Sequence, residues 1–161
     1  MSNELQQLYS EIIIKYDLND LYGFHINHID DYVESRGWVS SSTMLMIASY
    51  YGDTNIVKKC LKLGADVNKM NESGRNALFF SILSVKYEIT ELLLKAGANP
   101  NKKIKRGNTI IPMIFYINNV SGIKELIKYG ALLNEFYKYK EFIDLSPLRY
   151  FKKVLAKRRW V

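Results

Sequence analysis

The side chains that most often carry out chemistry are scarce in this sequence. Its 161 residues include one cysteine, Cys60, and two histidines, His25 and His28. The histidines stand three positions apart and could share a helical face with Asp30 or Asp31 as a further ligand, but two histidines make at best a weak metal site. With one cysteine and two histidines, the chain also offers few residues for a Cys/His nucleophilic pair. No phosphate-binding glycine loop or zinc-protease motif occurs. We therefore expect no metal, no cofactor and no catalysis, and predict that the protein is not an enzyme.

Two clusters of basic residues are the other chemically suggestive feature. One runs over Lys102, Lys103, Lys105 and Arg106, and the other groups Lys152, Lys153, Lys157, Arg158 and Arg159. Such clusters bind the phosphates of nucleic acid, or they form a solvated face. Binding of nucleic acid or another phosphate-rich ligand therefore stays open as an alternative function. An acidic protein surface is the partner that we favour.

The composition is that of one compact domain. Hydrophobic residues make up 48% of the chain and charged residues 24%, which excludes a disordered protein. Residues 1–40 carry 7 acidic and 2 basic side chains, a charge of −5, whereas residues 41–161 carry 9 and 21, a charge of +12. The single cysteine excludes an internal disulfide, as is typical of a reducing cell interior. No secretory signal or membrane segment stands out, so we expect an intracellular, cytoplasmic protein.

The sequence repeats itself with a fixed period of about 33 residues. Gly-Ala dipeptides begin at Gly64, Gly97 and Gly130, and each is followed by an asparagine at the fifth position. An amphipathic helical pattern precedes each glycine, and a shorter apolar helix precedes that pattern. The short helices start after Thr43, Asn76 and Thr109. Because glycine readily adopts the positive φ that closes a helix, this pattern predicts stacked helix–turn–helix units.

This arrangement resembles the ankyrin repeat, whose pattern runs Gly-x-Thr-Pro-Leu-His, then Ile-Val-x-x-Leu-Leu, then Gly-Ala-Asp-x-Asn. The resemblance implies an all-α solenoid with short β-turn loops and three repeats, at about 38–68, 69–101 and 102–134. The family's histidine is missing, since the matching segments read Met44-Leu45-Met46, Ala77-Leu78-Phe79 and Ile110-Ile111-Pro112. We therefore expect the repeats to be held more by apolar packing than by that histidine's hydrogen bonds.

Both ends of the chain depart from the repeat. Residues 1–37 are predicted to form a divergent helical cap, in which Leu5, Leu8, Ile12 and Tyr16 make the apolar face of an amphipathic helix. The segment from Asp30 to Glu34 could end a second helix. Residues 135–161 are predicted to form a truncated, basic C-terminal cap, because the last unit of a solenoid must cover its neighbour and also face water. We expect a single domain overall.

The resemblance also implies where a partner binds. In stacked repeats the loop tips and the inner helices form the contact surface, and side chains such as Trp, Tyr and Arg dominate interfaces. The candidate partner-binding residues are Trp38, Tyr50, Tyr51, Arg75, Leu83, Lys105, Arg106 and Tyr116. Trp38 and some of the tyrosines could instead pack against the N-terminal cap. Cys60 falls on an inward helical face, where it should act as a small hydrophobic residue.

The function that this resemblance implies is recognition of another protein without catalysis. The richness in Lys, Ile, Asn and Tyr resembles that of ankyrin proteins from AT-rich viral and host-associated bacterial genomes. We therefore expect a host-directed inhibitor or effector that occludes or scaffolds its partner, for example in innate immune signalling. The oligomeric state stays open, and no membrane partner is expected.

Overall fold

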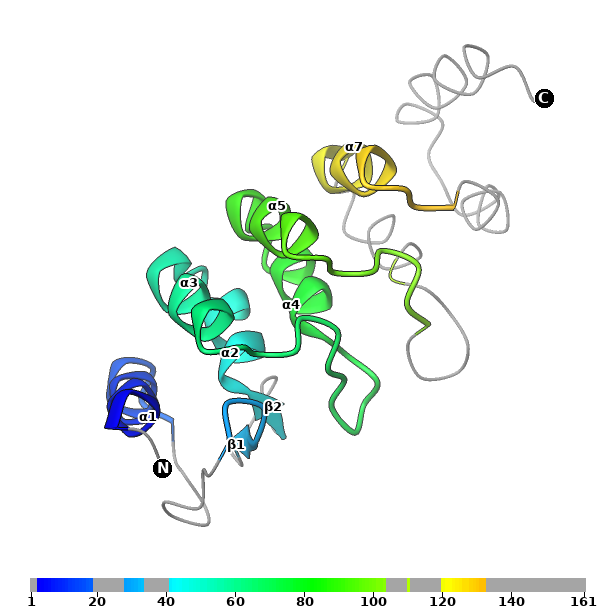
Figure 1. Ribbon diagram of the computed structural model, residues 1–161. Coiled ribbons are helices and arrows are strands. Elements are labelled where there is room, and N and C mark those ends of the chain that lie inside the picture. The colour runs from blue at the N-terminus through cyan, green and yellow to red at the C-terminus, as the bar shows by residue number, and fades with distance from the viewer. Residues whose placement is uncertain (1–2, 19–27, 34–40, 104–109, 111–119, 133–161) are drawn as a thin grey trace, which may run out of the picture.

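The computed structural model describes residues 3–18, 28–33, 41–103, 110 and 120–132, and the statements below concern those residues. Two short strands and a series of short helices follow one another along the chain: α1 Asn3–Lys15, β1 Tyr32–Val33, β2 Ser42–Thr43, α2 Met44–Tyr51, α3 Thr54–Lys62, α4 Ala77–Leu83, α5 Tyr87–Lys95 and α7 Val120–Lys128. In Figure 1, α1, α3, α5 and α7 form a row, and α2 and α4 lie alongside it. The predicted stack of helix–turn–helix units is confirmed.

The inner helices α2 and α4 form the centre of the core. Every residue from Met44 to Ser49 is buried, as is every residue from Ala77 to Ile82. Each helix begins at a polar N-cap: the Thr43 hydroxyl accepts a hydrogen bond from the Met46 N–H, and the Asn76 side chain accepts one from Phe79. Because helices of seven or eight residues are unstable alone in water, α2 and α4 depend on being covered by their neighbours.

The outer helices are amphipathic and bury the same positions in each repeat. Val57 and Cys60 in α3 correspond to Thr90 and Leu93 in α5 and to Ile123 and Leu126 in α7, and all six are buried. The glycines that follow these helices, Gly64, Gly97 and Gly130, have φ values of 84°, 92° and 89°. Their predicted role in ending each helix is confirmed.

Adjacent repeats are also joined by what we call the asparagine ladder, formed by the side chains of Asn68 and Asn101. Asn68 donates to the carbonyl of Gly97 at 3.0 Å and accepts from the N–H of Asn99 at 2.8 Å. Asn101 repeats both bonds one unit later, with Gly130 at 3.0 Å and Leu132 at 2.7 Å. Apolar packing holds the repeats together as expected. The asparagine ladder adds repeat-to-repeat hydrogen bonds to a chain that lacks the family's histidine.

The N-terminal helix covers the first repeat at the start of the stack. The predicted amphipathic helix is confirmed as α1, which buries Leu5, Leu8, Tyr9 and Ile12. Near the first repeat, the Asp30 carboxylate accepts a hydrogen bond from the Asp66 N–H at 2.9 Å. Asp66 holds the place in its repeat that Asn99 holds in the next one, so Asp30 makes the contact that Asn68 makes one unit later.

The prediction that Asp30 to Glu34 end a second helix is wrong. Tyr32–Val33 forms β1, which pairs antiparallel with β2 in the register Tyr32 with Thr43 and Val33 with Ser42. Two further features favour the extended backbone. The Val33 side chain is buried in the core, and the Tyr32 hydroxyl donates to the Met70 carbonyl at 2.6 Å. The 135–161 cap lies outside the described residues.

Asp53 joins α1 to the first repeat. One carboxylate oxygen accepts from the N–H groups of Asn55 and Ile56, both at 3.1 Å, and so caps α3. The other oxygen pairs with the Lys15 ammonium and accepts from the Tyr16 hydroxyl at 3.0 Å. A single side chain therefore fixes the start of α3 and the end of α1.

Replacing Asn68 by alanine should lower the free energy of unfolding by about 1–2 kcal/mol, because two repeat-to-repeat hydrogen bonds are lost. The matched control is Asn55→Ala, since Asn55 is an exposed asparagine on α3 outside the ladder; that change should stay within about 0.5 kcal/mol. Urea unfolding followed by circular dichroism measures both. Equal effects of the two substitutions would contradict a bonding role for the ladder.

Asp53→Ala should destabilise the protein by about 2 kcal/mol, because α3 loses its N-cap and α1 loses its anchor. Asp53→Asn keeps a capping oxygen but loses the charge. Partial burial opposes ionisation of Asp53, but bonds from Lys15, Ile56 and Tyr16 outweigh it and lower the pKa of the carboxyl. The stability that this charge provides is therefore present above about pH 4 and is lost as the pH falls further.

The measurement is urea unfolding of the wild type and Asp53→Asn at pH 7 and pH 3. The difference in unfolding free energy between the two proteins should shrink at pH 3, where the other carboxyl groups titrate equally in both. A difference that stays constant between the two pH values would contradict an ionic role for Asp53.

Candidate functional site

Five ring side chains contact one another in sequence from the N-terminal helix to the core, and we call them the aromatic row. Tyr16 stacks on Tyr51 with ring centroids 4.2 Å apart and an angle of 4° between the rings. Tyr51 meets Tyr50 edge-on at 5.4 Å, and Tyr50 meets Phe80 edge-on at 6.2 Å. Phe80 contacts Phe79 at 5.6 Å. Offset and edge-to-face contacts of this kind hold aromatic side chains in defined positions.

The aromatic row runs from the interior to the surface. Phe79 and Phe80 are buried, Tyr16 and Tyr50 are half-buried, and Tyr51 is 41% exposed. At the buried end, the guanidinium of Arg75 lies 5.2 Å from the centre of the Phe79 ring, an attractive cation–π geometry. Tyr51, at the C-terminal end of α2, thus rests on the ring of Tyr16. Arg75, before the N-terminal end of α4, rests on the ring of Phe79.

The loop that carries Arg75 is built by Asn71. The Asn71 side chain accepts from the Arg75 N–H at 3.0 Å, and its backbone N–H donates to the Arg75 carbonyl at 2.9 Å. Gly74 lies between them with φ 71° and donates its N–H to the Asn71 carbonyl at 2.8 Å. Asn71 is buried, so this loop tip is anchored to the body of the protein.

Electrostatics at the surface end of the row come from Asp53. Burial and the hydrogen bond to Asp53 raise the pKa of the Tyr16 hydroxyl well above its usual value. Tyr16 therefore stays neutral and keeps donating its proton to the carboxylate. The hydrogen bond to Asp53 also raises the pKa of Lys15, so the ammonium stays charged beside the carboxylate.

The structure separates the predicted partner-binding residues into two groups. Tyr50, Tyr51 and Leu83 lie at the C-terminal ends of α2 and α4, whereas Arg75 precedes α4 at the other end. Leu83 is half-buried and packs against the core. The other predicted residues lie outside the described part of the chain: Trp38, Lys105, Arg106 and Tyr116. Of the first basic cluster, Lys102 and Lys103 are described, and both are exposed.

Two residues outside the predicted partner-binding set help to form this surface. Tyr16, which the sequence predicts on the apolar face of a helix, lies one residue beyond α1 with its ring on Tyr51. Asp53 carried a usable signal, because an aspartate before Thr54 and Asn55 is typical of a helix N-cap. Its second role, pairing with Lys15 from 38 positions away, has no local signal.

Nothing in the described residues gathers three metal-ligating side chains, and none of the described helices is long and apolar enough to cross a membrane. Cys60 has no exposed surface, which confirms its inward position. Burial raises the pKa of its thiol to about 12, with a further contribution from the charge of Asp30. At neutral pH this cysteine is therefore a protonated, buried hydrophobic residue.

A family model for ankyrin repeats in three copies matches residues 12–104. The chain belongs to the ankyrin-repeat family. The match begins within α1, inside the predicted N-terminal cap, and it ends near the start of the third predicted repeat. The predicted bounds of the caps and of the three repeats therefore stay predictions. Ankyrin repeats are protein–protein interaction modules that generally carry no catalytic chemistry.

Curated relatives come from bacteria, a virus, a plant and animals. The chain is 34% identical over 99 residues to a putative ankyrin repeat protein of Rickettsia felis, covering 61% of this chain and 32% of the relative. It is 30% identical over 106 residues to one of fowlpox virus, covering 65% and 18%. It is 28% identical over 98 residues to the mouse RelA-associated inhibitor, covering 61% and 12%. The chain thus spans about a third or less of the length of these relatives.

Burial of Cys60 predicts a thiol that does not react in the folded state. A disulfide reagent such as Ellman's reagent at pH 8 should label Cys60 at least a hundredfold more slowly in buffer than in 6 M urea, because only the exposed thiolate is nucleophilic. Adding the reagent at several denaturant concentrations measures the exposure. Labelling in buffer at the rate of a free thiol would contradict the buried position.

Proposed function

We propose that this protein inhibits or redirects another protein by covering part of its surface, as a host-directed effector acting in the cytoplasm. The observation that carries the proposal is the aromatic row, which presents Tyr51 at the surface beside Tyr50. The neighbouring rings already hold both side chains. Binding of a partner to them would therefore lose little conformational entropy.

The second contact point of the proposed surface is the loop that ends at Arg75. Its guanidinium rests on the Phe79 ring, and the loop backbone is bonded to the buried Asn71. Arginine and tyrosine are the side chains that most often dominate binding energy in protein interfaces. Eight residues of helix span about 12 Å, so the two contact points would engage separate patches on one partner.

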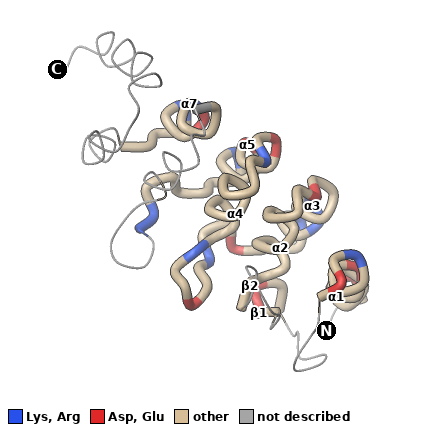
Figure 2. The backbone as a smooth tube through the Cα atoms, turned by 180° about the vertical axis from the view of Figure 1, so that it is seen from behind, with Lys and Arg blue, Asp and Glu red and all other residues tan. Residues whose placement is uncertain are grey.

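The proposed partner has an acidic surface. The chain carries a formal charge of +7. Figure 2 shows basic positions on the backbone beyond α5, where the side chains of Lys102 and Lys103 are exposed. Opposite charges steer association and raise the rate of binding.

The inhibitory part of the proposal draws on the comparisons. One relative is named as an inhibitor associated with RelA, and another belongs to a poxvirus. Because this chain spans only 12% and 18% of those relatives, the shared part is the repeat stack itself. A rigid stack that occupies a surface needed by another protein is sufficient for inhibition.

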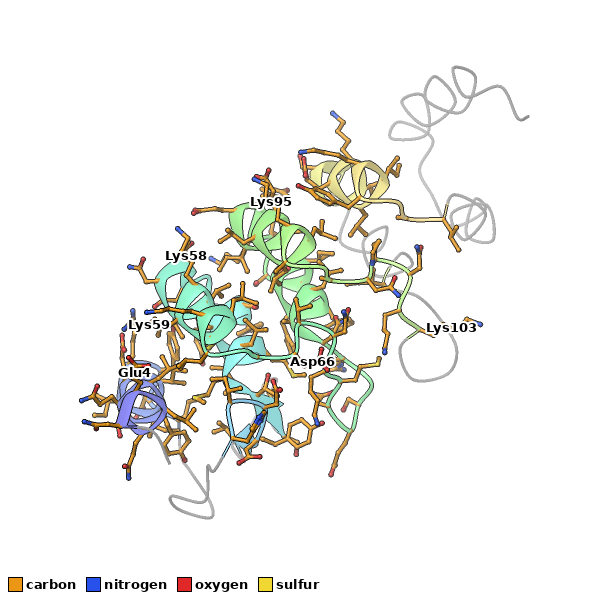
Figure 3. The ribbon with its side chains drawn as sticks, viewed as in Figure 1. Glu4, Lys58, Lys59, Asp66, Lys95 and Lys103 are labelled. Carbon is orange, nitrogen blue, oxygen red and sulfur yellow. The ribbon has the colours of Figure 1, made fainter. Side chains whose placement is uncertain are left out.

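Affinity purification from a cytoplasmic lysate of the producing or infected cell, with nuclease added, should recover a protein with an acidic surface. Against that purified partner, Tyr51→Ala and Arg75→Ala should each weaken binding about thirtyfold, corresponding to ~2 kcal/mol. The control is Lys58→Ala on the outer face of α3 (Figure 3), which should leave affinity unchanged. Titration calorimetry measures the affinities, and circular dichroism checks the fold of each variant.

Two outcomes would contradict the proposal. If all recovered material were lost on nuclease treatment, the basic clusters would be acting on nucleic acid. If Lys58→Ala weakened binding as much as Arg75→Ala did, the partner would contact the outer helices instead of the inner ones.

A further inference from the structure

The turns between paired helices form an edge of the molecule that begins at Tyr51, one end of the proposed contact surface, and continues away from Arg75. We call this the turn edge and define it as residues 51–54, between α2 and α3, and residues 84–87, between α4 and α5. The helix α2 starts beside the strand β2, and α3 returns toward the loop at 71–76. The turn edge therefore lies at the opposite end of the helix pairs from the loop that carries Arg75.

Val85 occupies a backbone conformation on this edge that valine disfavours. Its φ is +59°, in the left-handed region, where a β-branched side chain is strained. Gly52 holds the same place in the preceding repeat and makes the matching turn with φ +85°. The repeat thus accepts glycine at this place, and the backbone does not require valine.

Burial does not explain Val85 either. Its side chain is 45% exposed, so folding removes only part of it from water and gains little hydrophobic free energy. A residue that strains the backbone while adding little to the core points to a role outside the fold. That role is most simply a contact with another molecule.

Exposed hydrophobic side chains gather on the same edge. Five large hydrophobic residues are exposed in the part of the chain that the structure describes, and three of them are Tyr51, Val85 and Tyr87, at 41%, 45% and 41%. The other two, Ile14 and Leu132, lie on α1 and beyond α7. Single exposed hydrophobic residues are ordinary, whereas a group of them marks an interaction site.

The two turns are in contact, so these side chains belong to one surface. The Ser84 hydroxyl donates to the Ser49 carbonyl of α2 at 3.4 Å. The side chain of Lys86 crosses Gly52 so closely that a Cβ placed there would lie 2.7 Å from its Cδ. Val85 lies between these two contacts in the chain, so its turn borders the C-terminal end of α2.

A hollow beside Tyr51 provides space for a side chain. Its volume is about 330 Å³, and two tyrosines and the Lys15–Asp53 ion pair contribute to its walls. The lining residues are Lys15, Tyr16, Tyr51, Gly52, Asp53, Thr54 and Asn55. The rings of Tyr16 and Tyr51 are fixed by stacking, so one wall of the hollow is preformed. An open hollow with an aromatic wall accepts an apolar side chain of an extended chain.

The positive charge of Lys86 on this edge favours a partner segment that carries a negative charge. Lys15 is already paired with Asp53. Lys86 pairs with no carboxylate of the described residues, although Glu88 stands only two positions on. An ammonium left unpaired beside an apolar patch is complementary to a carboxylate on the incoming chain.

We propose that the turn edge binds an extended segment of another protein in which an apolar side chain stands next to an aspartate or glutamate. The apolar side chain enters the hollow against Tyr51, and the carboxylate pairs with the ammonium of Lys86, whose side chain crosses Gly52 at the border of the hollow. The backbone of the segment continues over Val85. The inference rests on the proposed function as a protein-binding module, and it extends the contact surface at Tyr51 to the turns and names the chemistry of its ligand.

A random twelve-residue peptide library displayed on phage, selected against the immobilised full chain, provides the test. We expect recovered peptides to share an apolar residue beside Asp or Glu. As synthetic peptides, they should bind Val85→Gly and Lys86→Gln at least fivefold more weakly than the wild type. Lys58→Gln, which removes an exposed lysine from the outer face of α3, is the matched control and should bind normally.

Stability measurements separate a binding role from a structural one. Because glycine relieves the positive φ, Val85→Gly should keep or raise the urea midpoint while it loses the peptide. A lowered midpoint would overturn the argument that valine serves binding and not the fold. Peptides with a basic consensus, or peptides that bind both turn-edge variants normally, would overturn the proposed ligand.

Arg75→Ala distinguishes failure of this inference from failure of the proposed function. Peptides lost on Arg75→Ala but not on Val85→Gly would place binding on the other surface, so the function would stand and the turn edge would not. Recovery of no peptide at all would overturn the turn edge, and the lysate purification would then decide the function separately.

Discussion

The structure depends on the requirement that each inner helix be covered by its neighbours. The helices α2 and α4 are short and almost wholly buried, and a helix of this length gains too few backbone hydrogen bonds to be stable alone. The amphipathic outer helices and the adjacent repeats supply the missing contacts. Stability therefore arises between units, as in other stacked repeats, and α1 provides the cover at one end where no preceding repeat is described.

Polar contacts make this apolar stack specific. Hydrophobic packing alone would tolerate small shifts of one unit against the next, whereas the asparagine ladder bonds Asn68 and Asn101 to defined backbone atoms of the following repeat. The N-caps Thr43, Asp53 and Asn76 fix where the helices start. A partner therefore meets a surface whose spacing is set before binding, which reduces the entropic cost of recognition.

The N-terminal helix couples the fold to the candidate surface. Tyr16 follows α1, and its ring lies on Tyr51 while its hydroxyl bonds to Asp53. The same contacts that cap the stack thus orient an exposed side chain of α2 and shape the hollow beside it. A change in α1 would alter both stability and the orientation of the Tyr51 ring, whereas Val85 and Lys86 on the turn edge can be changed with little disturbance of the core.

The sequence by itself determined the repeat, its period, the buried face of each helix and the glycines that end the outer helices, because these features depend on local spacing that returns with every unit. It also placed Cys60 inside and indicated Tyr50, Tyr51 and Arg75 as surface candidates. Only the tertiary structure decided that Tyr32 and Val33 are extended, that Tyr16 stacks on Tyr51, and that Lys86 crosses Gly52. Those contacts join residues 9 to 35 positions apart outside the periodic pattern. Their energies depend on how the units pack, which no local signal records.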